Sequence, residues 1–311
     1  MTMNHVDPTG TVLPSWRPGA TRDALVDFLD ASSELPTERR LACFDIDGTL
    51  WAERPTYAQF DFFVDALGRR VAQDPSLATR VEYAALLPGG SRAALGDLGL
   101  ARVAMALVEL FDGQSPEAFG AEVREFMSRA QHAALGRPLR STVYVPMLEL
   151  LAALRERQFT IALVTGGGTE FVRSISSDLY EVPPERVVGT LITYTFARDV
   201  QGRPTLRRSA QLDGRPNEGA VKVSNIQAQL GRAPVFAAGN SGGDREMLEW
   251  AVSEDGPSLA LLVDHDDEDR EFRYVGTAET VEEPEAITDV AQRLGWTVAS
   301  MRSDWASVFP A

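Results

Sequence analysis

Asp45 and Asp47 are two carboxylates that follow the apolar run 41–44 and stand on either side of Ile46, just before Gly48. An apolar run of this length, bounded by turn residues, predicts a buried strand of a parallel sheet. Ligands of open α/β sheets bind just outside the carboxyl ends of strands. Two carboxylates there can act as nucleophile, as acid and base, and as ligands of a hard metal ion. Two acids in a solvated turn are the alternative.

Two further segments follow predicted strands. Thr165-Gly166-Gly167-Gly168 comes after the strand predicted over 159–164, and a hydroxyl with glycine-exposed amides before a helix suits an anion such as phosphate. Gly239-Asn240-Ser241-Gly242-Gly243-Asp244 comes after the strand predicted over 234–238. It brings two oxygen-bearing side chains, Asn240 and Asp244, four residues apart, although a helix cap would use the same residue types.

Lys222 is the only lysine among the 30 basic residues of the chain. A preference for arginine in the whole genome accounts for the general skew but not for the one lysine that remains. One physical explanation for the single lysine is a site that needs the compact ammonium of lysine in place of the planar guanidinium of arginine. The alternative is that one lysine has remained by chance.

Composition excludes several classes of protein. The formal charge of −15 argues against duplex DNA or an anionic membrane as partner, because both need a basic face. Cys43 is the only cysteine, which excludes an internal disulfide, and it is expected to be a core residue. No run is apolar enough to span a bilayer, and residues 1–11 do not have the pattern of a signal peptide. A cytoplasmic protein is therefore expected.

The acidic run 264–271 lacks EF-hand spacing and is expected to be solvated, with His132 and His265 at the surface.

Strands alternating with helices predict an α/β core with a parallel sheet and right-handed crossovers. The pattern is interrupted between residues 57 and 139, where the chain is almost wholly helical. We therefore expect a core formed by residues 1–56 and 140–311 and an all-helical cap inserted over 57–139. The predicted elements are strands over 41–44, 159–164, 234–238, 258–263 and 297–299, a β-rich piece over 187–196 with a hairpin turn at 199–202, and helices over 22–29, 60–71, 78–87, 100–111, 116–131, 147–157, 170–179 and 221–230.

The order and strand context of these segments resemble the haloacid dehalogenase superfamily, in particular its phosphoserine-phosphatase-like branch. The family's four motifs map onto Asp45-Ile46-Asp47-Gly48-Thr49, Thr165-Gly166-Gly167, Lys222 and the segment 239–244. Pro14-Ser15-Trp16, residues 49–55, Met247-Leu248-Glu249-Trp250, Gly295-Trp296-Thr297 and the tail 304–310 also look like a bacterial group of acid-phosphatase-like members. The resemblance implies a three-layer Rossmann-like core with a helical cap.

The resemblance also implies roles for the residues. Asp45 would attack phosphorus and form an aspartyl-phosphate, and Asp47 would protonate the leaving alkoxide and then activate water. Thr165 with the Gly166 and Gly167 amides would bind phosphate oxygens, and Lys222 would bridge the phosphate and Asp45. Mg²⁺ would be held by Asp45, the Asp47 carbonyl and an oxygen from Asn240 or Asp244. Many members have aspartate where Asn240 stands, whereas the acid-phosphatase-like group shares the asparagine. Glu53 is one residue away from the place of a substrate-contacting glutamate.

The expected activity is a Mg²⁺-dependent phosphomonoesterase for a small phosphorylated metabolite, without a nucleic-acid or membrane partner. A phosphotransferase or phosphomutase would differ only in the second step, in which an alcohol in place of water would accept the phosphoryl group from Asp45. A 2-haloacid dehalogenase has no alkoxide to protonate, so Asp47 argues against it. A non-catalytic binding protein would not need Asp45, Asp47 and Lys222 together. Neither the substrate nor the oligomeric state can be predicted from the sequence.

Overall fold

The structure is a computed structural model that describes residues 12–90, 96–253 and 255–311. The expectation that residues 1–11 are not a signal peptide concerns a segment that the structure does not describe. Within them, no helix combines the length and the apolar character needed to cross a membrane.

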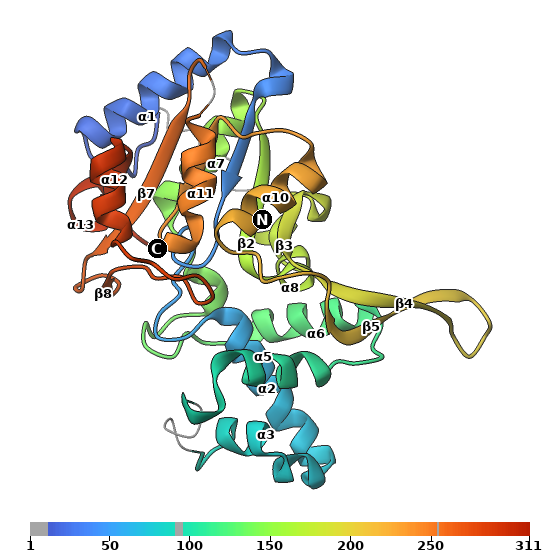
Figure 1. Cartoon of the computed structure of the whole chain (residues 1–311). Coiled ribbons are helices and arrows are strands. Elements are labelled where there is room, and N and C mark those ends of the chain that lie inside the picture. Colours follow the sequence, from blue (N-terminus) through green and yellow to red (C-terminus); the bar gives the residue numbers. More distant parts are fainter. Residues whose placement is uncertain (1–11, 91–95, 254) are drawn as a thin grey trace.

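A mostly parallel sheet forms the centre of the core, in the order β3-β2-β1-β6-β7-β8, with β9 also paired to β7 (Figure 1). Only the two-residue strand β8 runs antiparallel to its neighbour. This confirms the predicted α/β fold, and it places β1 between β2 and β6. The strands are β1 (Leu41–Phe44), β2 (Thr160–Gly168), β3 (Val187–Thr190), β6 (Phe236–Gly239), β7 (Leu259–Asp266), β8 (Arg273–Tyr274) and β9 (Thr297–Ser300).

Helices cover both faces of this sheet because alternate residues of each strand point to opposite sides. Ala42 and Phe44 of β1 contribute to one apolar cluster with α1, α7 and α13, while Leu41 and Cys43 contribute to another with α10, α11 and α12. The three layers therefore follow from the continuous apolar pattern of the strand, and Cys43 is a core residue as expected. The core helices are α1 (Ala20–Ala31), α7 (Val145–Glu156), α8 (Thr169–Arg173), α9 (Ser176–Tyr180), α10 (Ala220–Leu230), α11 (Arg245–Ala251), α12 (Ile287–Leu294) and α13 (Met301–Asp304).

A second lobe lies below the sheet in Figure 1 and contains the helices inserted between β1 and α7. Its centre is Phe62, whose ring contacts those of Phe111, Phe119 and Phe126 at centroid distances of 5.4–5.6 Å and that of Phe171, from α8 of the core, at 5.7 Å. The predicted boundaries at 56/57 and 139/140 stay a prediction. The helices are α2 (Ala58–Gln73), η3 (Pro75–Thr79), α3 (Val81–Leu86), α5 (Leu100–Glu109) and α6 (Pro116–Arg129).

Two predicted helices are each divided in the structure. The helix predicted over 78–87 is η3 followed by α3, because Asp74 caps η3 and Arg80 is extended. The helix predicted over 170–179 is α8 followed by α9, and the hydroxyl of Ser174 donates to the carbonyl of Glu170 at the break. A serine that bonds the preceding turn in this way competes with the helical backbone.

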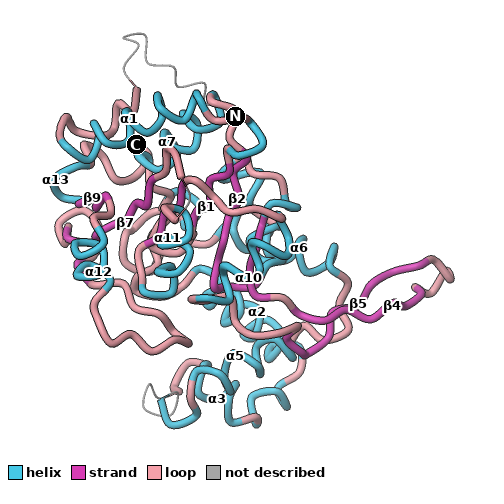
Figure 2. Tube along the Cα trace, turned by 45° about the horizontal axis from the view of Figure 1, so that its top comes forward, coloured by secondary structure: helices cyan, strands magenta, loops and turns pink. Residues whose placement is uncertain are grey.

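The β-rich piece after β3 is a two-stranded antiparallel hairpin, β4 (Ile192–Arg198) and β5 (Pro204–Leu212), with the turn at the predicted place. It projects away from both lobes in Figures 1 and 2. Its base is joined to the cap by backbone hydrogen bonds, from Gly113 N to Arg208 O (2.8 Å) and from Arg208 N to Gln114 O (2.9 Å). The hairpin thus belongs to the core in sequence and contacts the cap in space.

The expectation of solvated histidines and a solvated acidic run is wrong. His132 and His265 are both buried, as are Asp267 and Glu271 within the run 264–271. Asp267 is paired with Arg270, and Glu271 with His265. Buried charged groups need such partners, and these partners come from the tertiary structure.

Candidate active site

Asp45 follows β1, and its amide donates to Ala238 O of the neighbouring strand at 2.9 Å. The chain then turns at Gly48, whose φ of +76° favours glycine. A Cβ on Gly48 would also lie 2.0 Å from Asn240 Nδ2, so any side chain there would displace the Asn240 side chain. The turn therefore requires glycine for two independent reasons, and it holds Asp45 against the end of β6.

Lys222 lies in the first turn of α10 and is almost fully buried. Its ammonium donates to Asp45 Oδ1 at 2.7 Å, to Asp244 Oδ1 at 2.5 Å and to the Val164 carbonyl at 3.1 Å. Burial lowers the pKa of Lys222, but the carboxylates of Asp244 and Asp45 raise it by more, so the net pKa is above its ordinary value. The lysine is therefore a fixed positive charge that joins three of the predicted segments.

Asp244 and Asn240 have different surroundings. Besides Lys222, Asp244 accepts through Oδ2 from the amides of Asn240 and Ser241 at 3.1 Å each and from the Ser241 hydroxyl at 3.2 Å. Its carboxylate therefore organises the loop after β6. Asn240 donates through Nδ2 to Glu53 Oε1 at 3.1 Å, while its Oδ1 lies 3.5 Å from Thr49 Oγ1. Of the two, Asn240 has the oxygen that is less engaged by hydrogen bonds.

Thr165 is buried near the end of β2. It lies in the part of this strand where the register of the pairing with β3 shifts, between Val164 and Gly168. Its Oγ1 accepts from the Gly167 amide at 2.9 Å, which leaves the hydroxyl hydrogen to donate elsewhere. The Gly168 amide donates to Gln59 Oε1 of α2 at 2.8 Å. Gly166 to Gly168 are only half-buried. A phosphate that used the Gly167 amide would have to replace the bond to Thr165.

Asp47 is the half-buried carboxyl of the first segment, and Trp51 Nε1 donates to its Oδ1 at 2.8 Å. Burial raises the pKa of Asp47 to about 6 and that of Glu53 to about 8. Burial and the nearby Asp244 carboxylate also raise the pKa of Asp45. Asp45 and Asp244 share the one ammonium group, while Asp47 and Glu53 are hydrogen-bonded by the neutral side chains of Trp51 and Asn240, so Lys222 does not offset the charge of all four carboxyl groups when they are ionised.

This donor set fits a divalent metal ion. Within the described ranges, no group of three or more His, Cys, Asp or Glu side chains could by itself hold a metal ion. The predicted set instead combines the Asp45 carboxylate, the Asp47 carbonyl and an oxygen of Asn240 or Asp244. The oxygens of Asp244 are already engaged by Lys222 and the loop amides, so the Asn240 amide oxygen is the more available of the two. Carboxylate, carbonyl and water oxygens are the ligands that Mg²⁺ takes, and a cation would offset the excess charge of the buried carboxyls.

A family model of haloacid dehalogenase-like hydrolases matches residues 42–249, which is more than half of the chain and includes every one of these segments. The chain belongs to this family. No curated relative matches it. A protein of unknown function from Bordetella pertussis Tohama I has a similar structure, with a TM-score of 0.53 and 21% identity over 84% of this chain and 97% of that one.

Two further solved structures are similar to this haloacid dehalogenase-like hydrolase at lower scores. A cytosolic 5'-nucleotidase IIIB bound to cytidine has a TM-score of 0.44 and 14% identity, over 82% of this chain and 83% of that one. A phosphoserine phosphohydrolase-like protein from Francisella tularensis subsp. tularensis SCHU S4 has 0.40 and 15%, over 82% and 99%.

The hydrolase joins five of the residues that the sequence singled out by direct hydrogen bonds. Asp45, Lys222, Asp244, Asn240 and Glu53 form one chain of hydrogen bonds, with Asp47 and Thr165 on adjacent segments. Their roles, including the substrate contact of Glu53, stay predictions. Neither of the two cavities described is lined by the proposed catalytic side chains. One, of 820 Å³, lies between the cap helices and β5.

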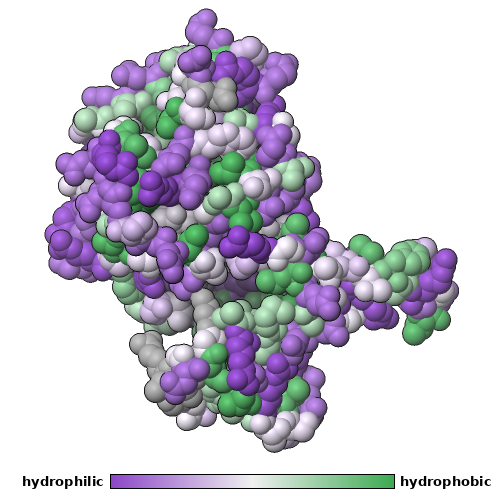
Figure 3. Space-filling model, viewed as in Figure 1, coloured by the Kyte–Doolittle hydropathy of each residue, from purple (hydrophilic) through white to green (hydrophobic). Residues whose placement is uncertain are grey.

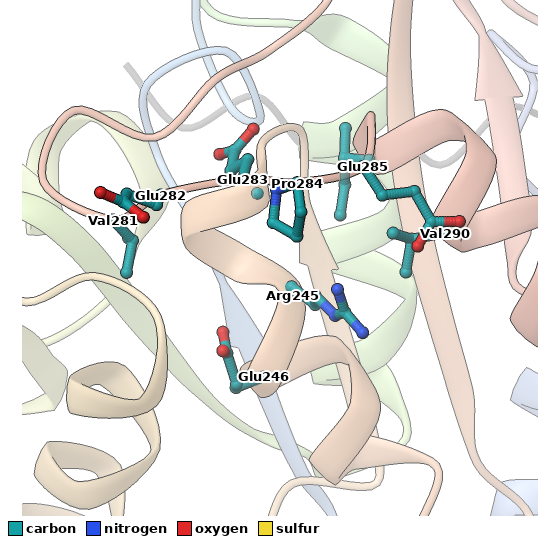
Figure 4. Close-up of a pocket in the computed structure, with 10 residues that line it drawn as sticks. Arg245, Glu246, Val281, Glu282, Glu283, Pro284, Glu285 and Val290 are labelled. Atoms are coloured by element: carbon teal, nitrogen blue, oxygen red, sulfur yellow. The ribbon is translucent and has the colours of Figure 1, made fainter.

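The other cavity lies behind the loop after β6. Figure 4 shows Arg245 and Glu246 on one side and residues 281–285 on the other. Its volume of 60 Å³ is that of about two water molecules. It is therefore too small for a metabolite.

Sequence reasoning missed His265 beneath the catalytic turn. His265 Nε2 lies 2.8 Å from the Gly48 carbonyl, and its Nδ1 lies 3.2 Å from Glu271 Oε2. A carbonyl oxygen only accepts, so Nε2 carries a hydrogen and the Gly48 carbonyl is held in place. Tyr144 donates to the other oxygen of Glu271 at 3.2 Å. The buried pair thus fixes the turn that carries Asp47.

We expect His265→Ala to lower kcat by about 10- to 100-fold with a smaller change in KM, because the turn loses its fixed carbonyl. The free energy of unfolding should fall by about 1–3 kcal/mol, since the buried carboxyl of Glu271 loses one hydrogen-bond partner and keeps Tyr144 and the Phe272 amide. Steady-state kinetics and urea unfolding measure the two effects. His132→Ala is the control, because His132 is also buried and accepts from backbone amides at 134 and 135. It should lose stability but keep kcat, and an equal loss of kcat in both variants would contradict the role of His265.

Glu53 gives the metal-free protein a defined pH dependence. Its pKa of about 8 in the folded protein lies above the ordinary value of 4.5, so the folded state retains a proton that the unfolded chain releases. This group therefore makes folding less favourable as pH rises from about 5 to about 8. Glu53→Gln keeps the acceptor for Asn240 and removes the charge. We expect its Tm advantage over the wild type to grow across this range in EDTA, and a constant difference would contradict the assignment.

Proposed function

We propose that this hydrolase is a Mg²⁺-dependent phosphomonoesterase acting on a small phosphorylated metabolite through an aspartyl-phosphate intermediate. The observation that carries the proposal is the ammonium of Lys222, 2.7 Å from Asp45 Oδ1 and fixed by Asp244 on its other side. A positive charge beside the nucleophile lowers the barrier to the approach of an anionic phosphate. It also holds the carboxylate in one orientation for in-line attack.

The chain's own residues then have separate tasks. The Asp45 carboxylate attacks phosphorus, the bond from phosphorus to the leaving oxygen breaks, and Asp47 gives its proton to that oxygen. In the second step Asp47 takes a proton from water, which attacks phosphorus and releases Asp45. Thr165 donates its hydroxyl hydrogen to a phosphate oxygen. The Asp45 carboxylate, the Asp47 carbonyl and the Asn240 amide oxygen would hold Mg²⁺, which would supply positive charge to the transferring group.

Asp47 supports phosphate hydrolysis in preference to dehalogenation. A halide leaves without a proton, so a dehalogenase has no use for a second carboxyl group at this position. In the structure, Asp47 is the more exposed of the two aspartates and is oriented by Trp51, as a residue that reaches a leaving group must be.

The test is release of inorganic phosphate and of nitrophenol from p-nitrophenyl phosphate by the purified protein. We expect equal amounts of both with Mg²⁺, none with EDTA, and recovery on addition of Mg²⁺ in excess. More nitrophenol than phosphate in the presence of alcohols would indicate a phosphotransferase instead. Chloride release from 2-chloropropionate without phosphate release from any phosphomonoester in a metabolite panel would overturn the proposal.

A further inference from the structure

The β4–β5 hairpin has one apolar and one polar face. Tyr194 and Phe196 alternate with Thr193 and Thr195 along β4, and Phe196 pairs directly with Leu206 of β5. Residues paired across an antiparallel ladder lie on the same face, so Phe196 and Leu206 form one apolar surface. A strand pair with this alternation normally has its apolar face covered.

Only the base of that face is covered. Arg208, which pairs with Tyr194, is buried with its guanidinium 3.7 Å from the centroid of the Phe119 ring, and it forms an ion pair with Glu170. Further out the same face has no cover from the part of the chain that the structure describes. Phe196 is 64% exposed, Leu206 is 45% exposed, and Val200 in the turn is 95% exposed. Figure 3 shows apolar surface, coloured green, on the projecting arm.

An isolated two-stranded hairpin is marginally stable in water and needs a further surface to pack against. The backbone bonds of Arg208 to residues 113 and 114 fix the base, so the arm cannot fold back onto its own cap without breaking them. No segment within residues 12–90, 96–253 and 255–311 covers this face, so we look for the covering surface on another molecule.

The charge of the arm indicates which molecule this is. Residues 192–212 contain four arginines and one aspartate, in a chain whose formal charge is −15. Arg208 is neutralised by Glu170 and Arg203 by Asp199, so the arm is basic through Arg198 and Arg207, while the remainder of the same chain is strongly acidic. A second copy of the chain offers the opposite charge to the arm, and two arms exchanged about a twofold axis give a closed assembly.

We infer that the β4–β5 hairpin is a dimerisation arm, whose apolar face, Phe196 and Leu206, is covered by a second copy of this chain, while its arginines are attracted to the acidic body of that copy. The arm does not contribute to the site around Asp45, so the inference stands or falls independently of the proposed activity. Because opposite charges guide the contact, high salt should weaken it.

The first experiment is sedimentation velocity of the full chain over a range of concentrations up to about 100 µM, where dimers of even modest affinity are populated. We expect a dimer for the wild type and a monomer, or a dissociation constant at least about tenfold higher, for Phe196→Ser with Leu206→Ser. Ala197→Ser with Thr205→Ser is the matched control, because these residues pair on the polar face of the same strands. It should remain a dimer. Circular dichroism establishes that each variant is folded.

A monomeric wild type would overturn the inference, and so would an unchanged dimer in the Phe196→Ser, Leu206→Ser variant. A second experiment locates the contact. Since Cys43 is the only cysteine and is buried, Val200→Cys provides one accessible thiol for a photoactivatable crosslinker. Mixed with isotope-labelled wild type, it should crosslink to the labelled copy. Crosslinks only within one copy would contradict the docking.

Discussion

Asp45→Asn should abolish phosphate release, with a loss in kcat on the order of 10⁵-fold. The amide has nearly the same shape as the carboxylate but has no negative oxygen to attack phosphorus, so the two-step route is closed. The loss should be in kcat, measured by release of phosphate from an aryl phosphate at saturating Mg²⁺.

The structure makes this variant a clean test of chemistry. Asp45 and Asp244 share one ammonium group, and burial together with Asp244 already raises the pKa of Asp45. Removing one of the two charges leaves Lys222 and Asp244 as a one-to-one pair, so the free energy of unfolding should not fall. Asp178→Asn, at an exposed position of α9, is the control and should keep full activity. An Asp45→Asn protein with wild-type activity would contradict the mechanism.

Lys222→Met should lose both activity and stability. Activity should fall about 10³-fold or more, because the charge that faces the transferring phosphate is gone. The free energy of unfolding should fall by about 3–5 kcal/mol, because two buried carboxylates lose their counter-ion. Lys222→Arg should not restore activity, since a planar guanidinium does not fit the space of an ammonium fixed between two aspartates. Kinetics and urea unfolding measure the two losses.

A second substitution separates the two effects. In Lys222→Met with Asp244→Asn, one of the uncompensated carboxylates is removed, so part of the lost stability should return while activity stays absent. If the double variant were no more stable than Lys222→Met alone, the ion pairs at 2.7 Å and 2.5 Å would not be the source of the stability loss.

The architecture of the site follows from short apolar runs in the sequence. Parallel strands end at the same edge of a sheet, so identifying the strands that precede Asp45, Thr165 and Asn240 is enough to predict that these residues meet. The structure adds that β1 lies directly between β2 and β6. The place of Lys222 could be inferred from the family resemblance only, because nothing in the helix over 221–230 points to a buried ammonium.

His265 and Glu271 show why other parts could not be predicted. His265 contacts a carbonyl 217 residues earlier in the chain, and Glu271 accepts from a tyrosine 127 residues earlier. A local stretch of charged residues carries no sign of such partners, so it suggests solvent exposure. The divided helices have a related cause, since the extended backbone of Arg80 and the Ser174 hydrogen bond to the preceding turn are local details that the apolar pattern does not reveal.

The bonds between residues 113 and 114 and β5 have a mechanical consequence. A cap that is connected to its core only through the two ends of its sequence is free to rotate about those connections. This cap is also held to the core by the backbone hydrogen bonds of Arg208 and by the hydrogen bond between Gly168 and Gln59. A hinged opening would break all of these contacts together. Because the hairpin carries one of these contacts, a partner that holds the arm in place would also restrict movement of the cap helices relative to the core.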